Sequence, residues 1–209
     1  MQILILGSTG GTGRELVRQG LDRGYTVTAF ARRPEALDLD HENLVKAAGD
    51  ILDKGSLEAA IMNQDAVLSA LGVNAFRQTT VLSDGTKNII QAMAQYDVDR
   101  FIVETAIGVG QSKQQLSPVL RFLMLSIFLR NVYIDKERQE EVIKESDLDW
   151  TIVRPAGLTD NELTKEYKVT EPTASAPVWA KISRADVAHF MLNQIEEDTW
   201  LHKAPSLFY

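Results

Sequence analysis

The sequence predicts a doubly wound α/β fold, with a mainly parallel sheet and helices on both of its faces. Short apolar runs alternate with longer stretches of helical periodicity along the 209 residues, and this alternation is typical of a parallel sheet covered by helices. The apolar runs are nearly continuous, as expected of strands that are buried on both sides. No internal repeat and no long linker divides the chain, so we expect a single domain over residues 1–209.

Six strands and five helices can be placed along the chain. The predicted strands are Ile3–Leu6, Thr26–Phe30, Leu44–Ala47, Ala66–Ala70, Phe101–Val103 and Trp150–Val153. The predicted helices are Gly13–Arg23, Ser56–Met62, Val81–Tyr96, Tyr133–Glu145 and Arg184–Ile195. Right-handed crossovers place the carboxyl ends of all the strands at one edge, where ligands bind. The regions at about 107–130 and 157–180 are therefore expected to form loops on the substrate side.

Composition excludes several classes of function. The net charge of −7 argues against a nucleic-acid partner, because neutralising phosphates needs clustered Lys and Arg. The chain has no Cys, and its three His residues lack ligand spacing, so no metal site is expected. We find no secretory signal and no apolar run long enough to span a bilayer, the nearest being Leu116–Leu129, which Arg121 interrupts. A cytoplasmic protein is expected.

A glycine-rich turn follows the first predicted strand directly and opens the first helix. Its sequence is GSTGGTG, over residues 7–13. Glycines at these places allow a sharp turn, close approach of a pyrophosphate and tight packing of helix on strand. The helix N-terminus adds free N–H donors for phosphate, and two threonines add hydroxyls. The residues predicted to hold the pyrophosphate are Gly7, Thr9, Gly10, Gly11, Thr12 and Gly13. This context predicts a Rossmann-type dinucleotide site, whereas a P-loop is excluded because no Gly-Lys-Ser/Thr follows.

Two arginines stand at the end of the second predicted strand, within the segment ARRP at 31–34. An NAD-specific site usually has an acidic residue here, about 20 residues beyond the turn, to bind the ribose hydroxyls. The guanidinium groups of Arg32 and Arg33 favour instead the 2′-phosphate of NADP, through charge-assisted hydrogen bonds. The sequence therefore predicts NADP(H) as the cofactor and a preference for NADPH over NADH.

Several segments together resemble a known family. They are GSTGGTG at 7–13, ARRP at 31–34, GDILD at 49–53, SALG at 69–72, VLSDGTKNII at 81–90, DVDRFIVETA at 97–106, SDLDWTIVRPAGLTD at 146–160 and ISRADVAHFML at 182–192. In this order they resemble the atypical short-chain dehydrogenases, in the NmrA-like NAD(P)-binding branch. Within that branch the chain is most similar to the NADPH flavin and biliverdin reductases.

The resemblance implies a role for further positions. It assigns Asp50 and Ile51 to the adenine, and Ala70, Leu71 and Gly72 to the path toward the nicotinamide. It also implies cofactor contacts for Ser83, Thr105, Lys136, Pro155, Ala156 and Gly157. In particular, Thr105 and Ala106 are expected to line the hydride-transfer site, and Lys136 to bind the nicotinamide ribose.

The chain departs from the family in its proton donors. Short-chain dehydrogenases pair a Tyr with a Lys four residues later, but the residue four beyond Tyr133 is Glu137, and Lys136 is only three beyond. The flavin and biliverdin reductases carry a serine where this chain has Ala106 and a histidine where it has Gly157. Alcohol oxidation is therefore not expected, because its hydroxyl proton must leave together with the hydride. The catalytic residues stay unassigned.

Two functions remain open from the sequence. One is an NADPH-dependent reductase that transfers hydride to a planar acceptor such as a flavin, biliverdin or a quinone, since such acceptors can take a proton from solvent. The other is a non-catalytic NADP(H)-binding sensor or assembly factor. Either a monomer or a homodimer is compatible with the sequence. Leu116–Leu129 can be a flap over the acceptor, an interface or core, and the charge run Asp135–Glu145 is expected to be a solvated helix face.

Overall fold

The computed structural model describes residues 1–73, 80–115, 130–171 and 179–209. Its strands form an eight-stranded sheet in the order β3-β2-β1-β4-β5-β6-β10-β8, and a separate pair of β7 and β9. The strands are β1 (Gln2–Leu6), β2 (Thr26–Ala31), β3 (Leu44–Ala48), β4 (Ala66–Ser69), β5 (Arg100–Glu104), β6 (Asp149–Pro155), β7 (Gly157–Thr159), β8 (Lys168–Thr170), β9 (Lys181–Ser183) and β10 (Ser206–Phe208). Only β8 runs antiparallel to its neighbour in the described sheet.

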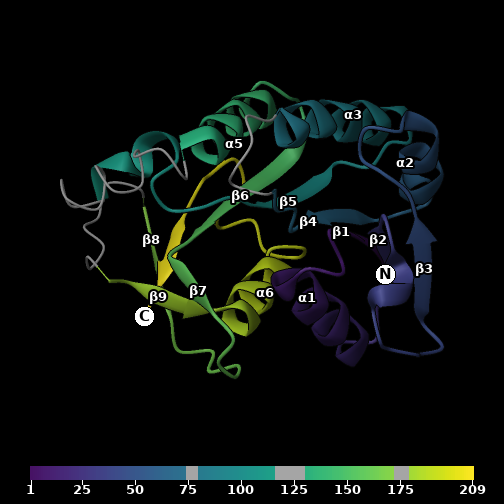
Figure 1. Cartoon of the computed structure of the whole chain (residues 1–209), viewed down its shortest axis with the longest axis horizontal. Helices are drawn as coiled ribbons and strands as arrows, with labels where there is room; N and C mark the ends of the chain where they lie inside the picture. The colour runs from purple at the N-terminus through teal and green to yellow at the C-terminus, as the bar shows by residue number, and fades with distance from the viewer. Residues whose placement is uncertain (74–79, 116–129, 172–178) are drawn as a thin grey trace.

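Helices cover both faces of this sheet (Figure 1). The helix α1 (Gly11–Asp22) packs with α6 (Arg184–Asn193) on one face, while α2 (Lys54–Ile61), α3 (Val81–Gln95) and α5 (Arg130–Lys144) lie on the other. Alternate residues of β1 serve the two cores, with Ile3 and Ile5 packed toward α1 and α6 and Leu4 and Leu6 toward the other helices. Each such side chain contributes about 1.5–3 kcal/mol by leaving water, which explains why the strands are apolar throughout.

The predicted doubly wound α/β class is confirmed, and all six predicted strands and five predicted helices are present. Two details differ from the prediction. The helix α1 begins at Gly11, inside the glycine turn, two residues earlier than expected. The predicted substrate-side loop at about 157–180 contains β7 and β8, and two further strands, β9 and β10, follow. Strands of three residues are too short to show a periodicity that sequence analysis can detect.

Part of the predicted loop region cannot be compared. Leu116–Leu129 lies outside the described residues, so the alternatives of flap, interface and core stay open. Before it, the chain forms the short helix η2 (Gly110–Gln115). Along the described ranges, no helix combines the length and the apolar character that crossing a membrane requires.

The expectation that Asp135–Glu145 is a solvated face is wrong, because three polar side chains of α5 are buried. The Asp135 carboxylate accepts hydrogen bonds from the Leu82 and Ser83 amides at 3.0 and 3.1 Å and from the Ser83 hydroxyl at 2.6 Å. It therefore caps the N-terminus of α3 from another helix. Glu140 lies against the fully buried Arg154, and Gln139 is also buried. The charges of α5 thus serve tertiary contacts that a local pattern does not reveal.

The segment ISRADVA has a structural role at the start of α6. Ser183 is the N-cap of α6. Its hydroxyl oxygen accepts a hydrogen bond from the Asp186 amide at 2.9 Å, and its hydroxyl donates to the Asp186 carboxylate at 2.8 Å. The Asp186 carboxylate also accepts from the amides of Thr164 and Lys165 and from the Tyr209 hydroxyl. These bonds outweigh burial, which acts in the opposite direction, and hold the pKa of Asp186 below its ordinary value. The cap fixes where α6 begins, and so which residue faces the glycine turn.

Candidate functional site

The glycine turn is packed too tightly for larger residues. Gly7 has a φ of +80°, and a Cβ on it would lie 2.7 Å from the Ala70 carbonyl oxygen. A Cβ on Gly13 would lie only 2.1 Å from the Gly7 carbonyl oxygen. The Gly10 amide donates to the same Gly7 oxygen at 2.9 Å and closes the turn. These distances agree with the sharp turn and the close packing of helix on strand that the sequence predicts.

This turn presents the N-terminus of α1 to the carboxyl edge of the sheet. The first amides of a helix have no intrahelical acceptor, and together with the helix dipole they attract anions. Gly10 and Gly11 are exposed, and the first turn of α1 contains no acidic residue that would compete for its amides. The arrangement can hold a phosphate without any basic side chain.

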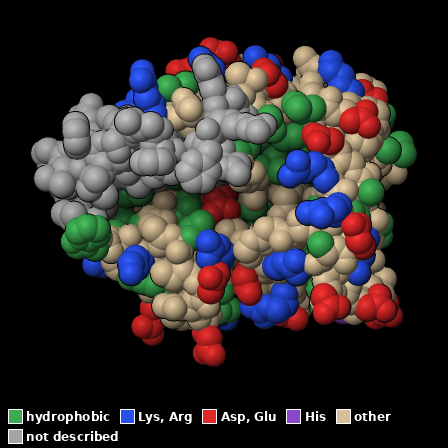
Figure 2. All heavy atoms as spheres, in the orientation of Figure 1, with side chains coloured by type: hydrophobic (Ala, Val, Ile, Leu, Met, Phe, Trp, Pro, Cys, Tyr) green, Lys and Arg blue, Asp and Glu red, His purple; other side chains and the backbone are tan. Residues whose placement is uncertain are grey.

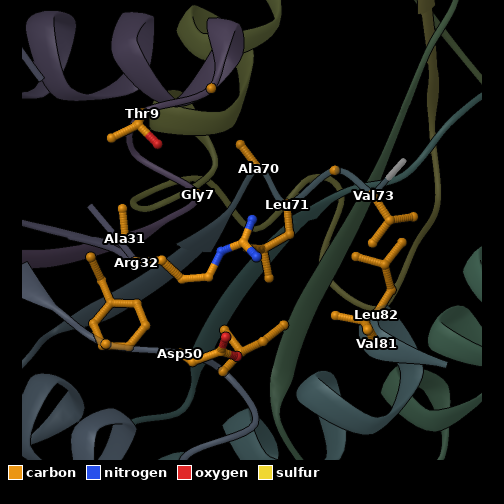
Figure 3. A pocket seen from close by; sticks show the side chains of 15 residues that line it. Gly7, Thr9, Ala31, Arg32, Asp50, Ala70, Leu71, Val73, Val81 and Leu82 are labelled. Atoms are coloured by element: carbon orange, nitrogen blue, oxygen red, sulfur yellow. The ribbon is translucent and has the colours of Figure 1, made fainter. Parts of the chain in front are cut away.

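A cavity of about 650 Å³ extends from this turn along the edge of β1, β2 and β3. It is lined by Gly7, Thr9, Gly10, Phe30, Ala31, Arg32, Gly49, Asp50, Ile51, Ala70, Leu71, Gly72, Val73, Val81 and Leu82. The Arg32 side chain reaches from the end of β2 into the cavity, between Asp50 and Leu71 (Figure 3). The cavity reaches across the switch point where the strand order reverses between β1 and β4, to the residues that follow β4. Doubly wound folds bind dinucleotides at this point.

The structure brings about half of the predicted cofactor residues to this cavity. Those that line it are Gly7, Thr9, Gly10, Arg32, Asp50, Ile51, Ala70, Leu71 and Gly72. The predicted residues that do not line it are Gly11, Thr12, Gly13, Arg33, Ser83, Thr105, Lys136, Pro155, Ala156 and Gly157. Both arginines are exposed, and Arg32 lines the cavity whereas Arg33 does not. The Ser83 hydroxyl faces Asp135.

Gly11, Thr12 and Gly13 form the first turn of α1. The remaining predicted residues, Thr105, Lys136, Pro155, Ala156 and Gly157, lie beyond the switch point, around the carboxyl ends of β5 and β6. The Lys136 ammonium donates to the Thr105 carbonyl oxygen at 3.1 Å, and the Thr105 hydroxyl donates to Glu140 at 2.9 Å. Pro155 ends β6, and Ala156 donates its amide to Leu207 at 2.9 Å. A hollow crosses this face of the molecule between the two helical layers, with Lys and Arg side chains along it (Figure 2).

Thr12 and Tyr133 direct their hydroxyl groups to partners inside the protein. The Thr12 hydroxyl donates to Glu104 Oε1 at 3.2 Å, and the Tyr133 hydroxyl donates to the Ile107 carbonyl oxygen at 3.1 Å. Burial raises the pKa of Tyr133 to about 12. A phenol with this pKa is a poor proton-transfer group near neutral pH, in accord with the missing Tyr–Lys spacing.

Sequence reasoning missed two charged residues on the far side of the glycine turn. Glu104 ends β5 and is buried, with 8% of its surface exposed. Arg184 begins α6, and its side chain lies against Gly11, where a Cβ would lie 2.5 Å from the Arg184 Cδ. Its guanidinium also pairs with the exposed Asp160 at 2.5 Å. A carboxylate at the end of an apolar strand was the available signal for Glu104. Arg184 lies within the segment ISRADVAHFML, whose family resemblance assigns this arginine no role.

Comparisons with known proteins agree with this geometry. A family model described as NAD(P)H-binding matches residues 7–198. The chloroplastic protein At2g34460 of Arabidopsis thaliana is 30% identical over 182 residues, covering 82% of this chain and 64% of that protein. The photosystem II assembly factor Ycf39 of Synechocystis is 24% identical over 214 residues, covering 97% of this chain and 61% of that protein. This chain thus spans less than two thirds of the length of either relative.

Two solved structures share the fold over the whole chain. A short-chain dehydrogenase/reductase of Veillonella parvula, solved in complex with NADP, has a TM-score of 0.81 at 20% identity and is covered over 94% of its length. ChuY, an anaerobilin reductase of Escherichia coli O157:H7, has a TM-score of 0.81 at 22% identity and is covered over 97% of its length. At these identities the likeness establishes the fold, and the chemistry has to be argued from the site.

Proposed function

Because this chain belongs to the NAD(P)H-binding family, we propose that it is an NADPH-dependent reductase that transfers hydride to a planar acceptor such as a flavin, biliverdin or a quinone. The observation that carries the cofactor assignment is Arg32, which extends into the cavity beside the glycine turn. Its guanidinium can bind a 2′-phosphate with charge-assisted hydrogen bonds. The oxidoreductase names among related proteins support the general class of reaction.

The choice of acceptor rests on two described positions that supply no proton donor. Ala106 offers no side-chain donor, and Tyr133 is held by Ile107 with a pKa of about 12. A reaction that needs a protein acid at the substrate oxygen is thereby disfavoured. Flavins, bilins and quinones accept hydride as conjugated electrophiles and take their proton from water. The protein then has to align the nicotinamide with the acceptor and to exclude competing orientations.

Turnover with a panel of acceptors tests this proposal. Purified protein is mixed with NADPH and FMN, biliverdin or a quinone, and loss of reduced nicotinamide is followed by its absorbance. We expect turnover with at least one acceptor and faster turnover with NADPH than with NADH. Tight NADPH binding without turnover of any of the three acceptors would reject the reductase while leaving the cofactor assignment intact.

Arg32→Ala is expected to weaken NADPH binding by about 10- to 100-fold, since a hydrogen bond to a charged group contributes about 1.5–3 kcal/mol. Affinity for NADH, which lacks the 2′-phosphate, should change little. Titration calorimetry with both cofactors measures the effect. Arg33→Ala should have a smaller effect, because Arg33 is exposed outside the cavity, and Lys46→Ala, an exposed cation on β3, serves as the control. An equal loss for NADH and NADPH would show that Arg32 does not bind the phosphate.

A second candidate function is a non-catalytic NADP(H)-binding assembly factor. It is favoured by the match of 97% of this chain to Ycf39, a photosystem II assembly factor, and by the missing Tyr–Lys pair together with Ala106 and Gly157. Such a protein would bind the cofactor, turn over no acceptor, and retain a stable protein partner. Affinity capture in the presence of NADP+ or NADPH, combined with the acceptor panel, separates the two candidates.

A further inference from the structure

Glu104 is a buried carboxylate that the proposed reaction does not use. It ends β5 and receives the Thr12 hydroxyl at 3.2 Å, so one hydrogen bond joins it to the glycine turn. Two cations act on it electrostatically, Lys136 from α5 and Arg184 from α6. Lys136 stays close to the strand end through its bond to the Thr105 carbonyl oxygen. The carboxylate therefore has one hydroxyl partner and two cationic neighbours, from three helices on both faces of the sheet.

The position of Glu104 along the sheet edge places it in the nicotinamide half of the site. The cavity that contains Arg32 and Asp50 covers the edge of the sheet from β3 to β4. A dinucleotide whose adenosine occupies that cavity and whose pyrophosphate lies at the N-terminus of α1 must continue across the switch point, over β4 and β5. Glu104 is the last residue of β5. Its carboxylate is thus nearer to the nicotinamide end of the cofactor than to the adenine end.

We infer that Glu104 shifts the relative affinity of the site for the two redox forms of the cofactor toward the oxidised form, NADP+. The two forms share adenine, ribose and phosphates, and differ in the positive charge on the oxidised nicotinamide ring. A carboxylate in a buried, low-dielectric region acts on that charge more strongly than one in water. The inference rests on binding of NADP(H), and it is independent of the identity of the acceptor.

The surroundings of Glu104 give the effect its sign. Lys136 and Arg184 both repel a cationic ring, and without Glu104 that repulsion would be stronger, although Asp160 pairs with Arg184 and Glu140 and Asp135 also act on Lys136. The Glu104 carboxylate offsets that repulsion. Any positive charge that develops on the ring as hydride leaves NADPH is stabilised in the same way. Glu104 therefore favours both hydride donation and retention of the oxidised cofactor.

The effect requires Glu104 to be ionised, which makes it dependent on pH. Burial raises the pKa of Glu104 above its ordinary value, against the charge of Lys136, the hydrogen bond from Thr12 and the charge of Arg184. Burial lowers the pKa of Lys136, against the charges of Glu104, Glu140 and Asp135. As the pH rises through the pKa of Glu104, the preference for NADP+ should increase. Loss of the Lys136 charge at higher pH acts in the same direction, so a Glu104 variant is needed to separate the two.

The test measures dissociation constants of NADP+ and NADPH by calorimetry for the wild type and Glu104→Gln, between about pH 5.5 and 8.5. We expect the variant to bind NADP+ about tenfold more weakly relative to NADPH, as estimated for a unit charge about 10 Å away at an effective dielectric constant of about 20. A tenfold change in this ratio corresponds to about 30 mV in the potential of the bound two-electron couple. Both forms carry the same 2′-phosphate, so protonation of that phosphate affects both dissociation constants equally and does not change their ratio.

Three further variants and one ligand serve as controls. Glu141→Gln makes the same chemical change at an exposed position of α5 and should leave the ratio unchanged. Binding of 2′-AMP, which has no nicotinamide, should be equal in the wild type and Glu104→Gln and reports that the adenosine cavity is folded. Should the glutamine variant fail this check, Glu104→Ala provides a second neutral replacement. Glu104→Asp, which keeps the charge, should retain most of the preference.

The inference would be overturned if the ratio of the NADP+ and NADPH dissociation constants were the same in the wild type and in a folded neutral variant at every pH. A variant that binds NADP+ more tightly relative to NADPH than the wild type does would also overturn it. Neither result would bear on the proposed reductase, which is tested by turnover. Conversely, if the protein turns over no acceptor but shows the expected shift in the ratio, the inference about Glu104 stands and the proposed reductase function is rejected. Absence of binding by either form would contradict both.

Discussion

Glu140→Gln is expected to destabilise the folded protein by about 3–5 kcal/mol, because it leaves a buried arginine without its counter-ion. Arg154 is fully buried, and its Nε and Nη2 donate to the two carboxylate oxygens of Glu140 at 2.9 and 2.5 Å. The carboxylate is 1% exposed. Glutamine presents an amide group where Arg154 needs an acceptor and removes the charge that compensates the guanidinium.

Urea unfolding measures this loss, and its pH dependence has a defined sign. Although burial acts to raise it, the pKa of Glu140 is held below its ordinary value by the hydrogen bond and charge of Arg154 and by Lys144. The wild type should therefore keep this contribution above the ordinary carboxyl pKa and lose it as the pH falls through the lowered value. Glu140→Gln should weaken that acid dependence.

Matched variants distinguish the loss of a counter-ion from a general packing defect. Lys144 also pairs with Glu140 at 3.0 Å but is 37% exposed, so Lys144→Met should cost less than about 1 kcal/mol. The double variant Glu140→Leu with Arg154→Met removes both charges and should recover much of the stability that Glu140→Gln loses. A Glu140→Gln protein within about 1 kcal/mol of the wild type would show that Arg154 finds another partner.

The core of the fold could be predicted because its physical cause is local. Each central strand has to fill two cores at once, so Ile3 to Leu6 are all apolar and the run is visible without any structure. The glycine turn is visible for the same kind of reason. Gly7 has a φ of +80° and Gly13 has no room for a Cβ, so the backbone geometry itself demands glycine at these positions.

The charged helix could not be interpreted from its sequence, because identical side chains serve opposite purposes. Glu141 is exposed on α5, whereas Glu140, one residue earlier, is buried against Arg154. Asp135 caps a helix whose first residue lies 54 positions earlier in the chain, at Val81. Only the packing of α3 against α5 determines which of these charges is buried. A pattern of i,i+4 charges contains no information about that contact.

In the candidate site, too, some residues are placed by strand topology and others by tertiary packing. Arg32 and Asp50 follow directly from strands that end at one edge, so topology alone brings them to one cavity. Glu104 and Arg184 meet at the glycine turn from β5 and α6, and their meeting depends on how α6 is anchored by Ser183 and Asp186. The lining of the cavity beside Arg32 could thus be predicted from sequence, while the charges on the far side of the glycine turn required the three-dimensional structure.

Gly13→Ala is expected to lower the affinity for NADP(H) by about 100-fold or more. The added Cβ would lie 2.1 Å from the Gly7 carbonyl oxygen, 2.8 Å from the Gly7 carbonyl carbon and 2.9 Å from the Ser8 Cα. All three atoms belong to backbone, so the clash cannot be relieved by rotating a side chain. The turn has to move away from α1, and a displacement of about 1 Å in a binding group can cost about 100-fold. Overpacking should also lower stability by about 1–3 kcal/mol.

Gly55→Ala is the matched control for this prediction. Gly55 lies in the first turn of α2, where a Cβ would meet its nearest atom, Asp53 Oδ1, at 3.7 Å, an ordinary contact distance. Alanine is the better helix former by about 1 kcal/mol, so this variant should be at least as stable as the wild type and bind NADP(H) equally well. Calorimetric titration and thermal unfolding of both variants make the comparison. If Gly13→Ala kept wild-type affinity, the amides of this turn would not form the pyrophosphate site, and the assignment of the cavity to a dinucleotide would fail with it.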